Sequence, residues 1–277
     1  MLISVKLAPV FEYAVLEEFW QAADDLGFGA IWNYDHFYGL GHGLSAAEQP
    51  TLEGWTTLAA MAALTTRARI GCMVTGVTYR HPAVLANMAT TIDHISGGRL
   101  EFGIGAAWHE SEHAGYGIPF PSPGTRIAML DEALTIIKGL WTQDIFSHEG
   151  KFWTITDALC NPKPIQKPHP PIIIGGNGER KTLRVVATHA NEWNSIGSSA
   201  DEFKRLNGVL DEHCAAIGRE RKEIRRGVQL FLMPDADGQV DSILASLPAF
   251  EDAGCEHAVL SFYSPPTRAL LEGIANR

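Results

Sequence analysis

The stretch IIIGGNGERKT, residues 172–182, decides which fold this chain is expected to adopt. Three isoleucines predict a short apolar strand, the glycines that follow predict a tight turn, and Arg180 and Lys181 are expected in the first turns of a helix. A buried strand followed by a helix is the repeating unit of parallel α/β proteins. The number of such units along the chain therefore decides between a closed barrel and an open sheet.

Apolar stretches of strand length recur along the whole sequence, with amphipathic helical patterns between them. The eight predicted strands are Ile3–Ala8, Gly29–Asn33, Ile70–Thr75, Leu100–Gly105, Pro171–Ile174, Glu192–Ser195, Val228–Met233 and His257–Phe262. An open doubly wound sheet would leave the last strands hard to place. Eight strand-then-helix units in 277 residues predict an α/β fold of the (β/α)8 TIM-barrel type.

One segment, Gln143–Pro170, breaks this rhythm. It contains SHEGKFWTI, which has the character of a hairpin, and the proline-rich stretch NPKPIQKPHPP. We expect an insertion at about residues 143–170, between the fourth helix and the fifth strand. Since no repeat, linker or low-complexity tract divides the sequence, residues 1–277 are expected to form a single domain.

Composition excludes several classes of protein. The formal charge is 22 − 32 = −10, which argues against binding to the phosphates of nucleic acid. No apolar run reaches 18 residues, so no membrane span is expected, and the N-terminal MLISVKLAP has no secretory pattern. The four cysteines are isolated, as suits reduced thiols in a cytoplasmic protein.

The stretch WNYDHFYGL, residues 32–40, follows the second predicted strand and places Asp35 and His36 at its end. In a TIM barrel the carboxyl ends of the strands converge on the active site, so both side chains can face it. Alternatively, Asp35 caps the next segment and His36 is a structural imidazole. The residues by themselves leave both interpretations open.

Two glycine-rich strand ends carry similar alternatives. The turn with Gly175, Gly176 and Gly178 can bring backbone N–H groups close to a phosphate, or it can simply make a tight corner. In EFGIGAAWHESEHAGYG, residues 101–117, small residues after the fourth strand leave room for a flat group or merely narrow a crowded barrel. Trp108 is expected to wall that space and Glu112 to order the loop.

Taken together, four stretches resemble one family. FGAIWNYDHF, IGCMVTGVTYRHPAVLANMATTIDHISGGRLEFGIGAAWHE, YGIPFPSPGTRIAMLDEAL and IIIGGNGERKT are similar to the luciferase-like monooxygenase superfamily, and closest to its branch dependent on the deazaflavin coenzyme F420. The resemblance implies a TIM barrel with an insertion region, usually dimeric. It places the cofactor ring at the carboxyl ends of the strands and the cofactor phosphate at a glycine-rich turn.

The resemblance also implies roles for particular residues. Asp35 and His36 match the family's Asp-His pair, with the histidine beside the reactive centre of the deazaflavin, and both are expected to be catalytic. Met73-Val74 matches a non-proline cis peptide against the ring, and Arg80 is expected to be structural. The residues expected at the cofactor are Asp35, Met73, Val74, Gly105, Ala106, Ala107, Gly175, Gly176, Asn177 and Gly178.

One position departs from the family pattern. Sugar-phosphate dehydrogenases of the F420 branch carry a catalytic glutamate after the fourth strand, where this chain has Trp108. That departure argues against the sugar-phosphate activity and favours a more apolar substrate. The residues expected in the substrate pocket are Trp32, Tyr38, Trp108, Trp193 and Phe231.

The resulting hypothesis is an F420-dependent oxidoreductase, a homodimer, that transfers hydride between the deazaflavin and a small organic substrate. His36, oriented by Asp35 or a backbone group, would carry the accompanying proton. An FMN-dependent monooxygenase of the same superfamily and a noncatalytic flavin- or deazaflavin-binding protein are the alternatives. No metal site is expected, and His109 and His113 are interpreted as residues of a loop at the solvent or the pocket rim.

Overall fold

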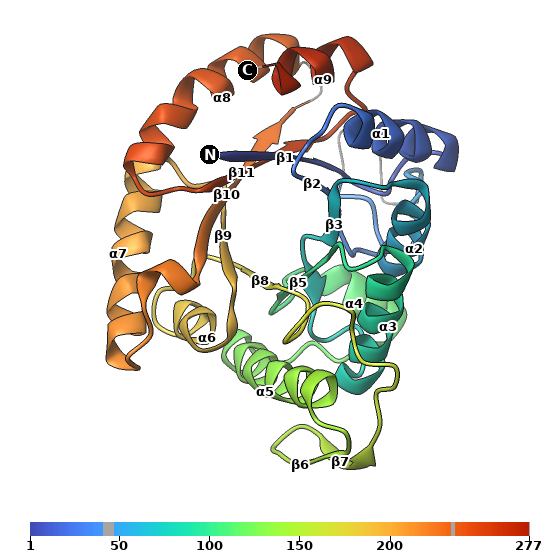
Figure 1. The fold of residues 1–277 in the computed structure, drawn as a ribbon, viewed down its shortest axis with the longest axis vertical. Helices are drawn as coiled ribbons and strands as arrows, with labels where there is room; N and C mark the ends of the chain where they lie inside the picture. Colours follow the sequence, from blue (N-terminus) through green and yellow to red (C-terminus); the bar gives the residue numbers. More distant parts are fainter. Residues whose placement is uncertain (41–46, 234–235, 277) are drawn as a thin grey trace.

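A closed ring of parallel strands forms the centre of the molecule (Figure 1). The computed structural model describes residues 1–40, 47–233 and 236–276. Within these ranges the ring runs β3-β2-β1-β11-β10-β9-β8-β5, and β3 pairs with β5 to close it. Its strands are β1 (Leu2–Leu7), β2 (Ala30–Asn33), β3 (Arg69–Cys72), β5 (Leu100–Gly105), β8 (Ile172–Gly175), β9 (Glu192–Ile196), β10 (Arg225–Leu232) and β11 (His257–Phe262). The predicted TIM barrel and each of its eight strands are confirmed.

The two-residue strand β4 (Thr75–Gly76) extends the third barrel strand beyond a break at Met73-Val74 and pairs with β5.

Helices surround the ring on its outside, as Figure 1 shows. They are α1 (Tyr13–Asp25), α2 (Gly54–Leu64), α3 (Pro82–Ile95), α5 (Pro123–Thr142), α6 (Thr182–His189), α7 (Ala200–Ala216), α8 (Ala236–Asp252) and α9 (Arg268–Ala275). The short helix α4 (Glu110–Tyr116) lies in the loop after β5, and a 3₁₀ turn covers Arg221–Glu223. Arg180 and Lys181 precede α6 rather than forming its first turns, because the turn after β8 is longer than the glycine spacing indicated.

The predicted insertion is an antiparallel hairpin between α5 and β8, made of β6 (Phe146–Glu149) and β7 (Thr154–Ala158). It lies beyond α5, away from the ring (Figure 1). The carboxylate of Glu132 on α5 accepts N–H bonds from Lys151 at 3.0 Å and from Trp153 at 2.9 Å. These bonds satisfy the backbone of the hairpin turn and attach it to the barrel.

Large aromatic side chains fill the layer between strands and helices. Phe102 points outward from β5 and contacts Trp55 of α2 and Trp141 of α5, with ring centroids 5.8 and 5.1 Å apart. All three side chains are almost fully buried, and burial of each stabilises the fold by roughly 2–3 kcal/mol. The described residues include no helix with both the length and the apolar character needed to cross a membrane.

The amino-terminal end of the barrel is closed by a buried polar network. His257 on β11 donates to the carboxylate of Glu192 on β9 at 2.8 Å and forms a hydrogen bond with the hydroxyl of Ser4 on β1 at 2.7 Å. Arg225 on β10 bonds to Glu192 and, at 2.9 Å, to Glu101 on β5. Since Ser4, His257 and Glu192 are almost completely buried, this arrangement links strands and has no access to a substrate.

Candidate active site

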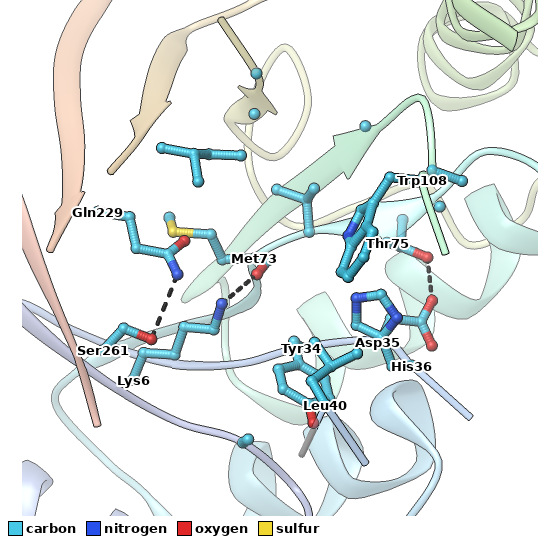
Figure 2. Close-up of a pocket in the computed structure, with 18 of the residues that line it drawn as sticks. Lys6, Tyr34, Asp35, His36, Leu40, Met73, Thr75, Trp108, Gln229 and Ser261 are labelled. Carbon is cyan, nitrogen blue, oxygen red and sulfur yellow. Dashed lines mark hydrogen bonds between the residues drawn. The ribbon is translucent and has the colours of Figure 1, made fainter. Parts of the chain in front are cut away.

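A cavity of about 470 Å³ opens at the carboxyl ends of the barrel strands (Figure 2). This volume lies in the range of small-molecule sites, and most of the lining is apolar. The predicted site residues that line it are Asp35, His36, Met73, Val74, Gly105, Ala106, Ala107, Trp108, Gly175, Gly176 and Phe231. The fold therefore brings together side chains from β2, β3, β5, β8 and β10.

Three aromatic residues expected in the substrate pocket do not line the cavity. Trp32 is completely buried one layer below it, in a cluster with Met73 and Ile173 inside the barrel. Trp193 points outward from β9 and stacks on Phe203 of α7 at 5.2 Å. Trp193 misses the cavity because alternation along the strand turns its side chain outward, and Trp32 misses it because its inward side chain lies too deep in the barrel.

Tyr38 is the third. It lies behind the β2 loop against His109 and Tyr116 of the α4 region, with ring centroids 6.4 and 6.0 Å away. Its hydroxyl occupies the place that a Cβ at Gly115 would need. Tyr38 thus packs two loops together and does not contribute to the cavity wall.

His36 is held in the cavity by Glu112, and not by Asp35 as the sequence suggested. Its Nδ1 lies 2.7 Å from Oε1 of Glu112, so the Nδ1–H group donates a hydrogen bond to the carboxylate. The other ring nitrogen, Nε2, is then free to act as an acceptor in the cavity. The His36 residue is 8% exposed, and its ring meets Tyr34 and Trp108 edge to face, with ring centroids 5.0 and 5.5 Å away. This packing fixes the ring plane as well as the tautomer.

Glu112 is completely buried on α4 and accepts four hydrogen bonds. Besides His36, it accepts the N–H groups of Phe37 at 2.9 Å and Tyr38 at 3.3 Å, and the hydroxyl of Tyr79. Burial alone would raise the pKa of Glu112, but the bonds and charge of His36 and the bond of Tyr79 outweigh it and lower the pKa to about 2. Glu112 is therefore ionised, and it orders the loop as expected.

Asp35 also lines the cavity, but it belongs to a separate ion-pair network. Its two carboxylate oxygens accept from Arg80 at 2.5 and 3.0 Å, and the Thr75 hydroxyl adds a third bond. Arg80 also contacts Glu53, which caps α2 by accepting the N–H of Thr56 at 2.6 Å. Asp35 thus neither caps a helix nor touches the His36 ring, and Arg80 has the structural role that was expected of it.

Val74 forms part of the cavity floor, and glycines make room for it. The Met73-Val74 peptide bond is cis, as the family resemblance implies. A Cβ added at Gly105 would lie 2.9 Å from Cγ2 of Val74, and one at Gly175 would lie 3.3 Å from Cγ1. Both interpretations of the small residues therefore apply. The glycines relieve crowding in the barrel by accommodating Val74, while Ala106 and Ala107 line open space that could take a flat group.

The glycine-rich turn after β8 borders a second hollow. Gly176 has φ 131°, a conformation that favours glycine, and Gly178 approaches Thr182 so closely that a Cβ would lie 2.5 Å from its hydroxyl. The amide of Asn177 is used to join β8 to β9, where its Oδ1 accepts the N–H of Ile196 at 3.1 Å. Thr182 lines both the cavity and this hollow.

The second hollow is lined by two cationic side chains, Arg180 and Lys181, and by Gly178. A Cβ added at Gly124, at the start of α5, would lie 3.1 Å from the amino group of Lys181. Thr182 separates the apolar cavity from this cationic hollow. A molecule with a flat apolar part and an anionic tail could therefore occupy the two at once.

Sequence reasoning assigned no role to several polar residues that line the cavity, among them Lys6, Gln229 and Ser261. These three project from β1, β10 and β11, so their positions along the predicted strands were the available signal. His113 was expected near the surface, yet it is completely buried in α4 and bonds to Thr78 and to the backbone of His109, each at 2.7 Å. Across the described residues, no three histidine, cysteine, aspartate or glutamate side chains are grouped as metal ligands.

Known proteins share this sequence pattern. The FMNH(2)-dependent dimethylsulfone monooxygenase of Pseudomonas putida is 31% identical over 172 residues, covering 62% of this chain and 46% of that protein. The F420-dependent glucose-6-phosphate dehydrogenase of Microbacterium testaceum is 30% identical over 212 residues, covering 76% of this chain and 61% of that protein. The chain thus spans about half to three fifths of the length of these curated relatives.

A solved structure shares the fold over the full length. An F420-dependent secondary alcohol dehydrogenase in complex with an F420-acetone adduct superposes with a TM-score of 0.85 at 17% identity, covering 100% of this chain and 98% of that chain. Residues 4–246 match the family described as luciferase-like monooxygenase. With its barrel, its cavity at the strand ends and a match over most of its length, the chain belongs to the luciferase-like monooxygenase family.

Proposed function

We propose that this protein is an F420-dependent oxidoreductase that transfers hydride between the deazaflavin and a small organic substrate. The observation that carries the proposal is the pairing of His36 with Glu112 at the wall of a largely apolar cavity. The likeness of the fold to an F420-dependent alcohol dehydrogenase and the F420-dependent relative support the choice of cofactor.

The residues present suit a flat phosphorylated cofactor. Val74, Ala106 and Ala107 offer an uncharged surface for a ring, and the hollow beyond Thr182 offers Arg180 and Lys181 for a phosphate. Gly176 and Gly178 allow the backbone to approach that phosphate closely. A bound deazaflavin supplies the two-electron hydride chemistry, which no protein side chain provides.

The chain's own contribution to the reaction is placement and proton transfer. When an alcohol is oxidised, its carbon would give a hydride to the bound deazaflavin, and His36 Nε2 accepts the proton that leaves its oxygen. In the direction of reduction, the same nitrogen returns it. Glu112 keeps Nδ1 protonated and stabilises the positive charge that the imidazole acquires. Trp108, 62% exposed, lies at the rim of the cavity beside His36.

Separate titrations with F420 and with FMN test the proposal. Binding is followed by the visible spectrum of the cofactor and by tryptophan fluorescence, to which Trp108 contributes from the cavity. We expect F420 to bind in the micromolar range and to quench the fluorescence, with a smaller change in Trp108→Phe. Failure of both cofactors to bind would overturn the proposal.

A second candidate is an FMN-dependent monooxygenase, which the Pseudomonas putida relative favours. In that case FMN binds more tightly than F420, and reduced FMN consumes oxygen when the substrate is present. Light scattering in the same experiments tests the expected homodimer.

A further inference from the structure

Lys6 is a buried cation inside the cavity, at the end of β1 and away from His36 (Figure 2). The residue is 5% exposed, and its ammonium group donates to the carbonyl of Met73 at 2.7 Å. It also lies 5.6 Å from the centre of the Tyr34 ring. In residues 1–40, 47–233 and 236–276, no carboxylate forms an ion pair with it.

Two neutral polar side chains accompany Lys6 at this end of the cavity. Ser261 on β11 is its direct neighbour across the β1–β11 pairing, and Gln229 on β10 donates to the Ser261 hydroxyl at 3.3 Å. Figure 2 shows all three together on the side opposite Trp108 and His36. Every residue of this group projects from a barrel strand, so their relative positions are fixed by the ring.

A buried ammonium group such as that of Lys6 destabilises the fold unless a negative charge or further hydrogen-bond acceptors compensate it. An ammonium group has three N–H donors, and the Met73 carbonyl uses one of them. The titratable groups that face it, Tyr34 from the β2 end and Cys72 from β3, both have raised pKa values because they are buried, so neither supplies a negative charge at neutral pH. Burial lowers the pKa of Lys6 to about 8, which still leaves it mostly protonated at pH 7.

We propose that Lys6, Gln229 and Ser261 form a subsite for a carboxylate of the substrate. That a substrate occupies this subsite rests on the proposed function, whereas the binding of an anion there does not. The substrate is then a hydroxy or oxo acid, or an unsaturated acid, whose reacting carbon lies towards His36 and whose carboxylate accepts from Lys6 and Gln229. The apolar lining between the two ends accommodates its hydrocarbon part. The expected substrate is therefore mainly apolar and carries a carboxylate at one end.

Calorimetric titration of the full chain with benzoate and with neutral benzamide tests the subsite without any redox cofactor. We expect benzoate to bind roughly tenfold or more tightly than benzamide at pH 7, as a charge-assisted hydrogen bond requires. Lys6→Met should abolish the preference and Lys6→Arg should retain part of it. Lys222→Met is the matched control, because it removes the same charge from an exposed side chain. Melting curves establish that each variant is folded.

Three results would overturn the subsite. One is equal binding of benzoate and benzamide, and another is an unchanged preference in folded Lys6→Met. The third concerns the source of the anion: if saturating F420 displaces benzoate and Lys6→Met weakens F420 instead, the cofactor occupies this end of the cavity. As benzoate binding is measured first without cofactor, a failure of the subsite and a failure of F420 binding remain distinguishable.

Discussion

Glu112 and His36 are 76 positions apart in the chain, yet their side chains meet at 2.7 Å at the wall of the cavity. The carboxylate comes from α4, a short helix in the loop after β5, while the imidazole follows β2 directly. Together they form the acid–base pair on which the proposed proton transfer depends.

Removal of the imidazole should affect turnover much more than binding. We expect His36→Ala to lower kcat about 100- to 10,000-fold, because general acid–base catalysis contributes that range, while the Kd for F420 changes less than about threefold. Glu112→Gln, which keeps an acceptor for Nδ1 but loses the charge, should lower kcat by a smaller factor. Stopped-flow measurement of hydride transfer checks both variants, and turnover of His36→Ala at the parental rate would contradict the role.

Glu112 should also make stability depend on pH in the acid range. Its folded pKa of about 2 lies below the ordinary value of 4.5, so its contribution is fully present above pH 5 and is lost as the pH falls towards 2. The loss amounts to about 3 kcal/mol at most, from the size of the shift. Urea denaturation between pH 7 and pH 3 should show a flatter pH dependence in Glu112→Gln than in the parental protein. Parallel curves for the two proteins would show that the carboxylate is not held as described.

Arg80 should be essential for stability because it neutralises the fully buried Asp35. We expect Arg80→Gln to reduce the free energy of unfolding by about 3–5 kcal/mol, since it leaves an uncompensated buried charge. Asp35→Asn in the same chain should recover a large part of that loss. Urea denaturation of the two single variants and the double variant measures the coupling, and strictly additive effects would be inconsistent with the ion pair.

The fit between Gly105 and Val74 can be tested by crowding it. Gly105→Ala places a methyl group 2.9 Å from Cγ2 of Val74, so that side chain must move into the cavity. We expect a cost of about 1–2 kcal/mol in cofactor binding, or about tenfold in Kd, with little change in the melting temperature. Val74→Ala should restore binding in the double variant. If Gly105→Ala binds F420 normally, Val74 does not border the ring.

The fold was accessible from sequence because each barrel strand is a continuous apolar run followed by a helix, as in residues 172–182. The depth and the direction of individual side chains could not be predicted from the sequence, as Trp32 and Trp193 show. Each lies near a strand end and is large and aromatic, but the first fills the barrel interior and the second packs against α7. Whether a strand residue points inward depends on register, which an unbroken apolar run does not reveal.

The hydrogen-bond and ion-pair partners of Asp35 and His36 could not be predicted from the sequence either. Asp35 and His36 are adjacent, which suggested that one orients the other, but successive residues project in different directions. Their real partners, Arg80 and Glu112, come from other loops and meet them only in the closed ring. Lys6 appeared at a strand end, but only the structure shows it buried among neutral groups.

The pairing of β1 with β11 has a consequence for how the protein is made. Leu2–Leu7 and His257–Phe262 are hydrogen-bonded neighbours, so β1 pairs with a strand that is synthesised much later. Lys6 and Ser261, which are paired in register across this seam, can meet only after all the residues between them have been synthesised. In a nascent chain the cavity is therefore incomplete until β11 has joined the ring.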